Sequence, residues 1–157
     1  MKYIKSFENN FTDIFKKRKK LPIEVINFSE ILTKTIEKAI DNDWDVYSNI
    51  YGINNKKYYD IISIFVDPHD LDDAAEVVEL HYNLSRNAIL YCYHPKMNFM
   101  ENIQNFLSDI IRNSSCEDIS VKNDNRYWIP LDKLPEIINK INDTNFELFK
   151  MTNKFNL

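Results

Sequence analysis

The spacing of apolar residues changes near Trp44, and that change limits the folds open to this chain. Between Ile23 and Ile40 the apolar residues recur at helical intervals and form one stripe. In the stretch 44–52 that follows, two sets of side chains alternate, as on a strand whose two faces differ. A helix followed closely by a two-faced strand predicts helices that pack against a sheet.

Three other segments have helical spacing: 2–18, 99–111 and 131–141. The first ends in the basic run 16–20, and the C-terminus of a helix favours such cations. Ser29 is placed to cap a restarted helix within 23–40. In the last segment we expect Asp132 to cap the helix and Pro135 to lie in its first turn.

Strand patterns come in pairs separated by turn residues. The pairs are 44–52 with 58–66 around Gly52, 77–84 with 88–94 around 85–87, and 118–122 with 126–130 around 123–125. We expect 68–75 to form a short helical turn after Pro68, although a helix through 70–84 is the alternative. Each short connection predicts antiparallel neighbours.

The predicted fold class is therefore α+β, with two N-terminal helices and helices packed on one face of a mainly antiparallel sheet of about four to six strands. At 157 residues we expect a single domain, 1–157. Within it, 1–20 is the first helix with its basic end, and 143–157 is a C-terminal tail.

The single glycine, Gly52, excludes several common enzyme classes. Glycine-rich phosphate loops and nucleophile elbows need more glycines than this chain contains. No apolar run approaches the roughly 20 residues that span a bilayer. Two cysteines make no disulfide framework, which predicts a reducing, cytoplasmic location.

An acidic segment carries the main functional prediction. From Tyr58 to Ser85 there are seven acids and no lysine or arginine, within a net charge of -4. Tyrosines are frequent here, and an acidic surface with tyrosines is typical of one that binds a basic cleft in another protein. The residues predicted to bind the partner are Asp67, Asp70, Asp72, Asp73, Glu76 and Glu79.

Two residue sets offer competing chemistry. Cys92 and His94 share one face of a predicted strand, and with His81 they supply three zinc ligands or a nucleophile and base. Asp67, Glu79 and Lys96 loosely match a metal-dependent nuclease. Neither set has a recognised spacing, so we predict no catalytic residue, no metal and no cofactor. The basic run 16–20 lacks supporting cations, which argues against nucleic-acid binding.

The overall profile is similar to that of immunity proteins of bacterial toxin systems and of small inhibitors encoded by phages. No motif carries this resemblance, so it transfers no site residues. It implies a non-enzymatic, cytoplasmic immunity or antitoxin protein that binds a toxin, with a nuclease as the leading partner, and occludes its active site. The alternatives are a small hydrolase or metal-dependent enzyme that uses the His, Cys and Asp residues, and a phage-type inhibitor of a host defence protein.

Overall fold

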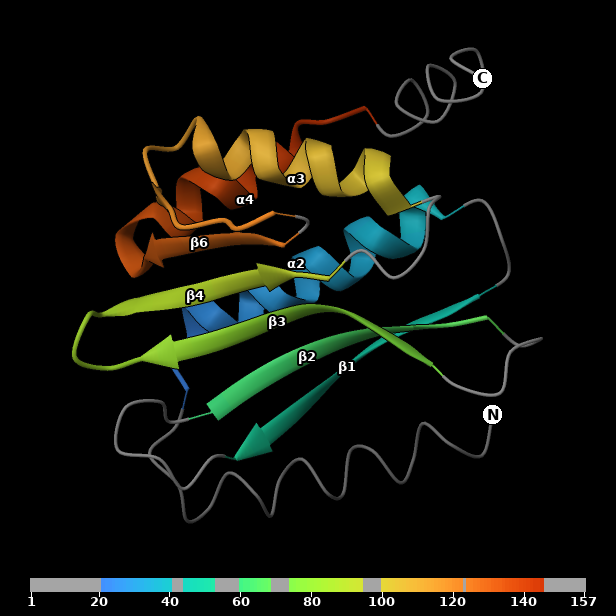
Figure 1. Cartoon of the computed structure of the whole chain (residues 1–157), viewed down its shortest axis with the longest axis horizontal. Helices are drawn as coiled ribbons and strands as arrows, with labels where there is room; N and C mark the ends of the chain where they lie inside the picture. Colours follow the sequence, from blue (N-terminus) through green and yellow to red (C-terminus); the bar gives the residue numbers. More distant parts are fainter. Residues whose placement is uncertain are drawn as a thin grey trace.

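A computed structural model describes residues 21–40, 44–52, 60–68, 74–94, 100–122 and 124–145. Within these residues the chain forms three α-helices and one six-stranded sheet (Figure 1). The helices are α2 (Ile23–Ala39), α3 (Glu101–Arg112) and α4 (Leu134–Asn142). This confirms the α+β prediction. None of these helices has the length and apolar character needed to cross a membrane.

Among the described strands the sheet is antiparallel throughout, with β1 at one end of the order and β5 at the other. Its strands are β1 (Asp45–Gly52), β2 (Asp60–Asp67), β3 (Ala75–Asn83), β4 (Ala88–Tyr93), β5 (Glu117–Asp118) and β6 (Asn125–Pro130). Their order is β1-β2-β3-β4-β6-β5, and every neighbouring pair is antiparallel. The three predicted strand pairs are therefore confirmed as neighbours. The sequence did not predict that β4 pairs with β6.

The described residues include α2 but none of the predicted first helix, 1–20, which remains a prediction. The same holds for the tail from 146 onward. Helix α2 is continuous, so the predicted restart at Ser29 is wrong. The Oγ of Ser29 donates a hydrogen bond to the carbonyl oxygen of Ile26 at 2.7 Å, and Ser29 is buried in the helix. Its hydroxyl therefore bonds within the preceding turn and does not cap a new helix.

The start of the last helix also differs from the prediction. A 3-10 turn, η2 (Leu131–Lys133), precedes α4, and Lys133 occupies the N-cap position without a side-chain cap. Asp132 is therefore not the cap, because the 3-10 turn moves the start of the α-helix one residue on, to Leu134. Pro135 does lie in the first turn, where its missing N–H is tolerated.

The segment for which a helix through 70–84 was the alternative contains strand β3. It begins at Ala75, so the predicted helical turn is wrong at that residue, and 69–73 lie outside the described residues. A register shift accompanies this early start: Ile64 lies opposite Val78, but Phe65 lies opposite Glu76. The extra residue, Val77, is fully buried, and its burial favours the bulge.

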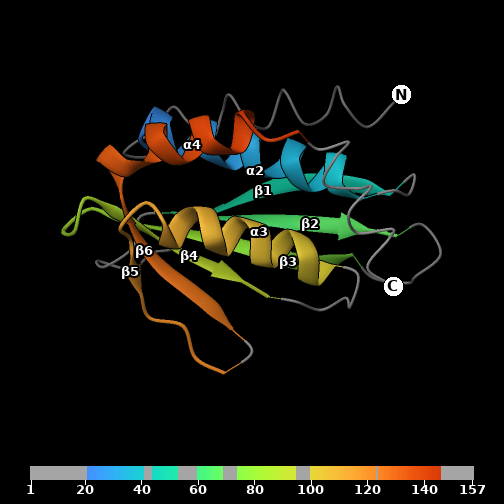
Figure 2. The ribbon, with the colours of Figure 1, turned by 90° about the horizontal axis from the view of Figure 1, so that it is seen from above.

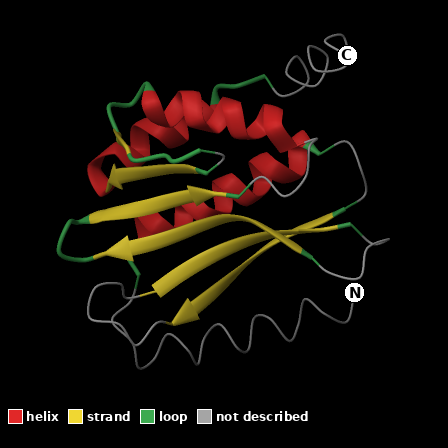
Figure 3. Cartoon of the chain, in the orientation of Figure 1, coloured by secondary structure: helices red, strands yellow, loops and turns green. Residues whose placement is uncertain are grey.

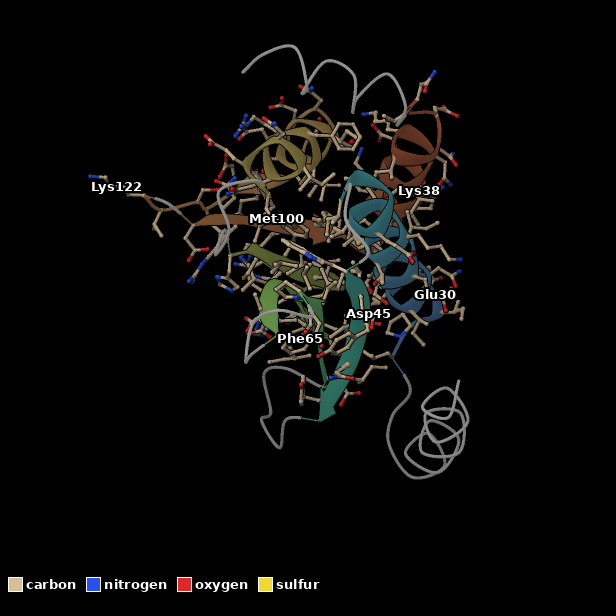
Figure 4. The ribbon with its side chains drawn as sticks, turned by 90° about the vertical axis from the view of Figure 1, so that its right-hand side faces the viewer. Glu30, Lys38, Asp45, Phe65, Met100 and Lys122 are labelled. Atoms are coloured by element: carbon tan, nitrogen blue, oxygen red, sulfur yellow. The ribbon has the colours of Figure 1, made fainter. Side chains whose placement is uncertain are left out.

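One face of the sheet forms the core. Ile62, Leu80, Tyr91 and Tyr127 lie opposite one another across β2, β3, β4 and β6, and all four are buried. The three helices gather on this side of the sheet (Figures 2 and 3). Figure 4 shows Met100 between the sheet and α3, deep in this core. Because side chains alternate along a strand, the intervening residues occupy the opposite face.

The core predicts which truncation destabilises the fold. We expect Phe28→Ala in α2 to lower the free energy of unfolding by roughly 3–5 kcal/mol, because this fully buried ring leaves a cavity. Ile23→Ala, at a position on the same helix that is 61% exposed, is the control and is expected to change it by less than about 0.5 kcal/mol. Urea unfolding followed by circular dichroism measures both. Equal effects would contradict this packing.

Candidate functional site

The face of the sheet that points away from the helices carries the candidate site, and we call it the open face. A polar row crosses it, in which Ser63, Glu79, Cys92 and Arg126 lie opposite one another on β2, β3, β4 and β6. Phe65 of β2 lies on this side, away from α2, in Figure 4. The open face contains two distinct polar regions.

The first region is an acidic corner, formed by Asp45, Asp67 and Glu76. Asp45 of β1 lies directly opposite Asp67 of β2, and Glu76 of β3 lies opposite Phe65, two residues from Asp67. The structure thus brings together two of the six predicted partner-binding residues, Asp67 and Glu76. It adds Asp45, which sequence reasoning missed. Only the pairing register of β1 with β2 identifies it.

The acids of the acidic corner form no ion pair with a cation of the described residues. The ion pairs that the described residues do form involve other acids, and none of these pairs includes Asp45, Asp67 or Glu76. Lys122 projects from the tip between β5 and β6, on the other side of the molecule from Asp45 (Figure 4). Like charges directly opposite on neighbouring strands destabilise a sheet, so we expect the Asp45–Asp67 pair to cost folding free energy.

Two aromatic rings stack beside the acidic corner. Tyr47 and Phe65 lie opposite each other on β1 and β2, with ring centroids 5.4 Å apart and an interplanar angle of 16°. Burial, and after it the carboxylate of Asp67, raises the pKa of Tyr47 above its ordinary value. The corner therefore combines rigid aromatic surface with negative charge.

Asp70, Asp72 and Asp73 lie outside the described residues, in the connection 69–73. That connection joins the end of β2 to the start of β3, and both of those strand ends carry acids of the corner. The assignment of these three residues to partner binding remains a prediction.

Glu79, the sixth predicted residue, belongs to a second region instead. We call it the His/Cys cluster, and it comprises Glu79, His81, Cys92, His94, Asp124 and Arg126. The Oε2 of Glu79 lies 2.8 Å from the Nε2 of His81 and 3.6 Å from the Nε2 of His94. The hydrogen bond with His81 is the main cause that lowers the pKa of Glu79 to about 2. This carboxylate is already paired, unlike those of the acidic corner.

Cys92 lies directly opposite Glu79 and is buried. Ligand atoms of Glu79, His81 and Cys92 all lie within 4.8 Å of one another, so the three residues could hold a metal ion. Burial raises the pKa of the Cys92 thiol to about 11. A thiol that stays protonated at neutral pH is a poor nucleophile, which argues against the thiol-enzyme alternative.

Asp124 and Arg126 complete the cluster from the β6 side, and sequence reasoning missed both. The Nε of Arg126 donates a hydrogen bond to the Oδ2 of Asp124 at 2.8 Å. The Oδ1 of Asp124 is buried, accepts no hydrogen bond, and lies 3.8 Å from the Nδ1 of His94. The pairing of β4 with β6 brings these residues together, and no signal in the sequence specifies that pairing.

Comparison of the chain with protein-family models, with curated proteins and with solved structures finds no match. A functional conclusion must therefore be drawn from the residues of the site.

The acidic corner predicts an unusual stabilising substitution. We expect Asp67→Asn to raise the free energy of unfolding by roughly 0.2–1 kcal/mol at low salt, because it removes the repulsion from Asp45. The gain is expected to shrink in 1 M salt, where the screening length is about 3 Å. Urea unfolding at both salt concentrations measures it. Glu30→Gln, at an exposed position on α2, is the control and is expected to give no gain. A loss of stability in Asp67→Asn would contradict the repulsion.

The burial of Cys92 predicts its reactivity. The variant Cys116→Ser leaves Cys92 as the only thiol. In the presence of a chelator, we expect an aromatic disulfide reagent to react with this variant at least about tenfold more slowly when it is folded than when it is unfolded in urea, because Cys92 is buried. Stopped-flow absorbance measurements at neutral pH give the two reaction rates. Fast reaction of the folded protein would restore the thiol-enzyme alternative.

Proposed function

We propose that this protein binds and neutralises another protein, with the acidic corner as part of the contact surface. The observation that carries the proposal is the direct opposition of Asp45 and Asp67, with Glu76 nearby and no ion pair between these acids and a described cation. Such an arrangement lowers stability in the free protein. Lysine and arginine side chains of a partner would remove the repulsion on binding, which favours a partner with a basic surface.

The stacked Tyr47 and Phe65 support a protein partner over a small cation. Aromatic side chains are enriched at protein interfaces because they bury a large area with few rotatable bonds. Tyr51, farther along β1 on the same face, is 45% exposed and extends this aromatic surface. The complementary partner surface is a basic cleft that accepts the carboxylates of the acidic corner together with the neighbouring aromatic rings.

An enzyme that degrades nucleic acid fits that description. Its substrate-binding cleft presents lysine and arginine to phosphates. Carboxylates spaced along one corner can occupy those cations in place of phosphates, so the inhibitor occludes the active site. Asp70, Asp72 and Asp73, which follow Asp67 in the chain, remain predicted contributors to the contact. We therefore propose a cytoplasmic immunity or antitoxin role, with a nuclease toxin as the partner.

Charge reversal tests the proposal. The full chain, immobilised, is used to capture a partner from a lysate of its source organism, and the purified partner is then titrated by calorimetry. We expect the double variant Asp67→Lys and Glu76→Lys to bind more than about tenfold more weakly at low salt, with a smaller salt dependence, because two attractive charges become repulsive. One equivalent of unaltered protein is expected to abolish the partner's nuclease activity.

The matched control is Glu24→Lys with Glu30→Lys, which changes the net charge equally at exposed positions of α2. It is expected to bind as the unaltered protein does. Equal weakening by both double variants would reduce the effect to net charge. Unchanged binding by the corner variant would remove the acidic corner from the interface.

A further inference from the structure

Four potential metal ligands project from two neighbouring strands of the open face. Glu79 and His81 are two residues apart on β3, while Cys92 and His94 are two apart on β4 and just beyond its end. The register places Glu79 directly opposite Cys92. The backbone N–H of His94 donates a hydrogen bond to the carbonyl oxygen of Val77 at 2.8 Å, which continues the strand pairing to this residue.

We propose that Glu79, His81, Cys92 and His94 bind one zinc ion that crosslinks β3 and β4. The donors are one thiolate, two imidazole nitrogens and one carboxylate oxygen, a combination that zinc accepts and that calcium and magnesium disfavour. On binding, the Cys92 thiol releases its proton to solvent as the Sγ–zinc bond forms. One thiolate and one carboxylate then neutralise the two positive charges of the ion.

The distances are close to those of such a site. Tetrahedral zinc with bonds of about 2.0–2.3 Å holds its donor atoms about 3.3–3.8 Å apart. The Nε2 of His94 lies 3.6 Å from the Oε2 of Glu79, within that range. The Nε2 of His81 lies 2.8 Å from the same oxygen, and Cys92 completes a set within 4.8 Å. His94 lies outside that set, so the proposed site requires its ring to rotate toward His81 and Cys92 while the strand pairing stays unchanged.

Asp124 supplies an independent observation. Its Oδ1 is buried without a hydrogen bond and lies 3.8 Å from the Nδ1 of His94, while its Oδ2 is held by Arg126. Metal-bound histidines usually donate their second ring N–H to a carboxylate, which orients the ring toward the metal. The unused oxygen of Asp124 is placed for that role. His94 would then present its Nε2 to the ion.

The site is accessible and has no vacant ligand position. The side chains of His81, Glu79 and His94 are 18%, 26% and 28% exposed, which leaves a route from solvent. Four protein ligands complete a tetrahedron, so the ion would stabilise the sheet and would not activate water. This inference does not depend on the proposed partner. It does remove Glu79 from the set available to a partner's cations.

Cobalt and zinc titrations of the full chain, after removal of metal by a chelator, test the site. With cobalt we expect one equivalent to produce a thiolate charge-transfer band and the visible bands of tetrahedral coordination, and zinc to abolish both. Zinc is also expected to raise the melting temperature. Binding of much less than one equivalent, or a spectrum without the thiolate band, would overturn the proposal.

Matched variants use the remaining cysteine and histidine of the chain. Cys92→Ser is expected to lose the thiolate band and the thermal shift, whereas Cys116→Ser keeps both. His94→Gln is expected to weaken zinc binding more than tenfold, whereas His69→Gln does not. Because His94 is partly exposed, its variant remains informative even where Cys92→Ser fails to fold. A thiolate band that survives in Cys92→Ser would overturn the assignment.

Asp124→Asn tests the orienting role. We expect it to lower zinc affinity by about 10–100-fold while the thiolate band is retained, because the ligands remain but His94 is no longer held. An affinity equal to that of the unaltered protein would remove Asp124 from the site.

Discussion

The burial of one face of the sheet against α2, α3 and α4 is the constraint on which the rest of the structure depends. The row Ile62, Leu80, Tyr91 and Tyr127 is removed from water by these helices. Burial of apolar area is the main favourable term in folding. It also fixes the register, because a slip of one residue would move the apolar side chains of the slipped strand to the opposite face of the sheet. The register fixed by the buried face also decides which side chains lie next to one another on the open face.

The open face holds two polar regions that differ in whether their acids are paired with basic side chains. In the His/Cys cluster, Glu79 is paired with histidines and Asp124 with Arg126. In the acidic corner, Asp45 and Asp67 oppose each other without a described counter-charge. We associate the first region with a small cation that joins two strands, and the second with a protein partner that brings its own cations. The two roles use different residues, so either can be removed without the other.

The elements were predictable where the apolar period was strong, as in α2, β1, β2 and α3. Predictions failed where a local choice depended on neighbours. Ser29 does not restart a helix, because the stripe on both sides of it is buried continuously. Asp132 does not cap α4, because a 3-10 turn comes first. Of the predicted partner-binding acids, the structure groups Asp67 with Glu76, because the bulge at Val77 places Glu76 on the open face opposite Phe65. Glu79 instead lies beside His81 and His94.

The sequence by itself determined that side chains two apart on a strand share a face, which joins Glu79 with His81 and Cys92 with His94. Alternation is a property of the single extended chain and needs no partner strand. Only the tertiary structure decided that these two pairs lie opposite each other, that Asp45 opposes Asp67, and that β6 brings Asp124 to His94. Strand order and register depend on how the whole apolar face packs against the helices, and that energy is shared among residues far apart in the chain.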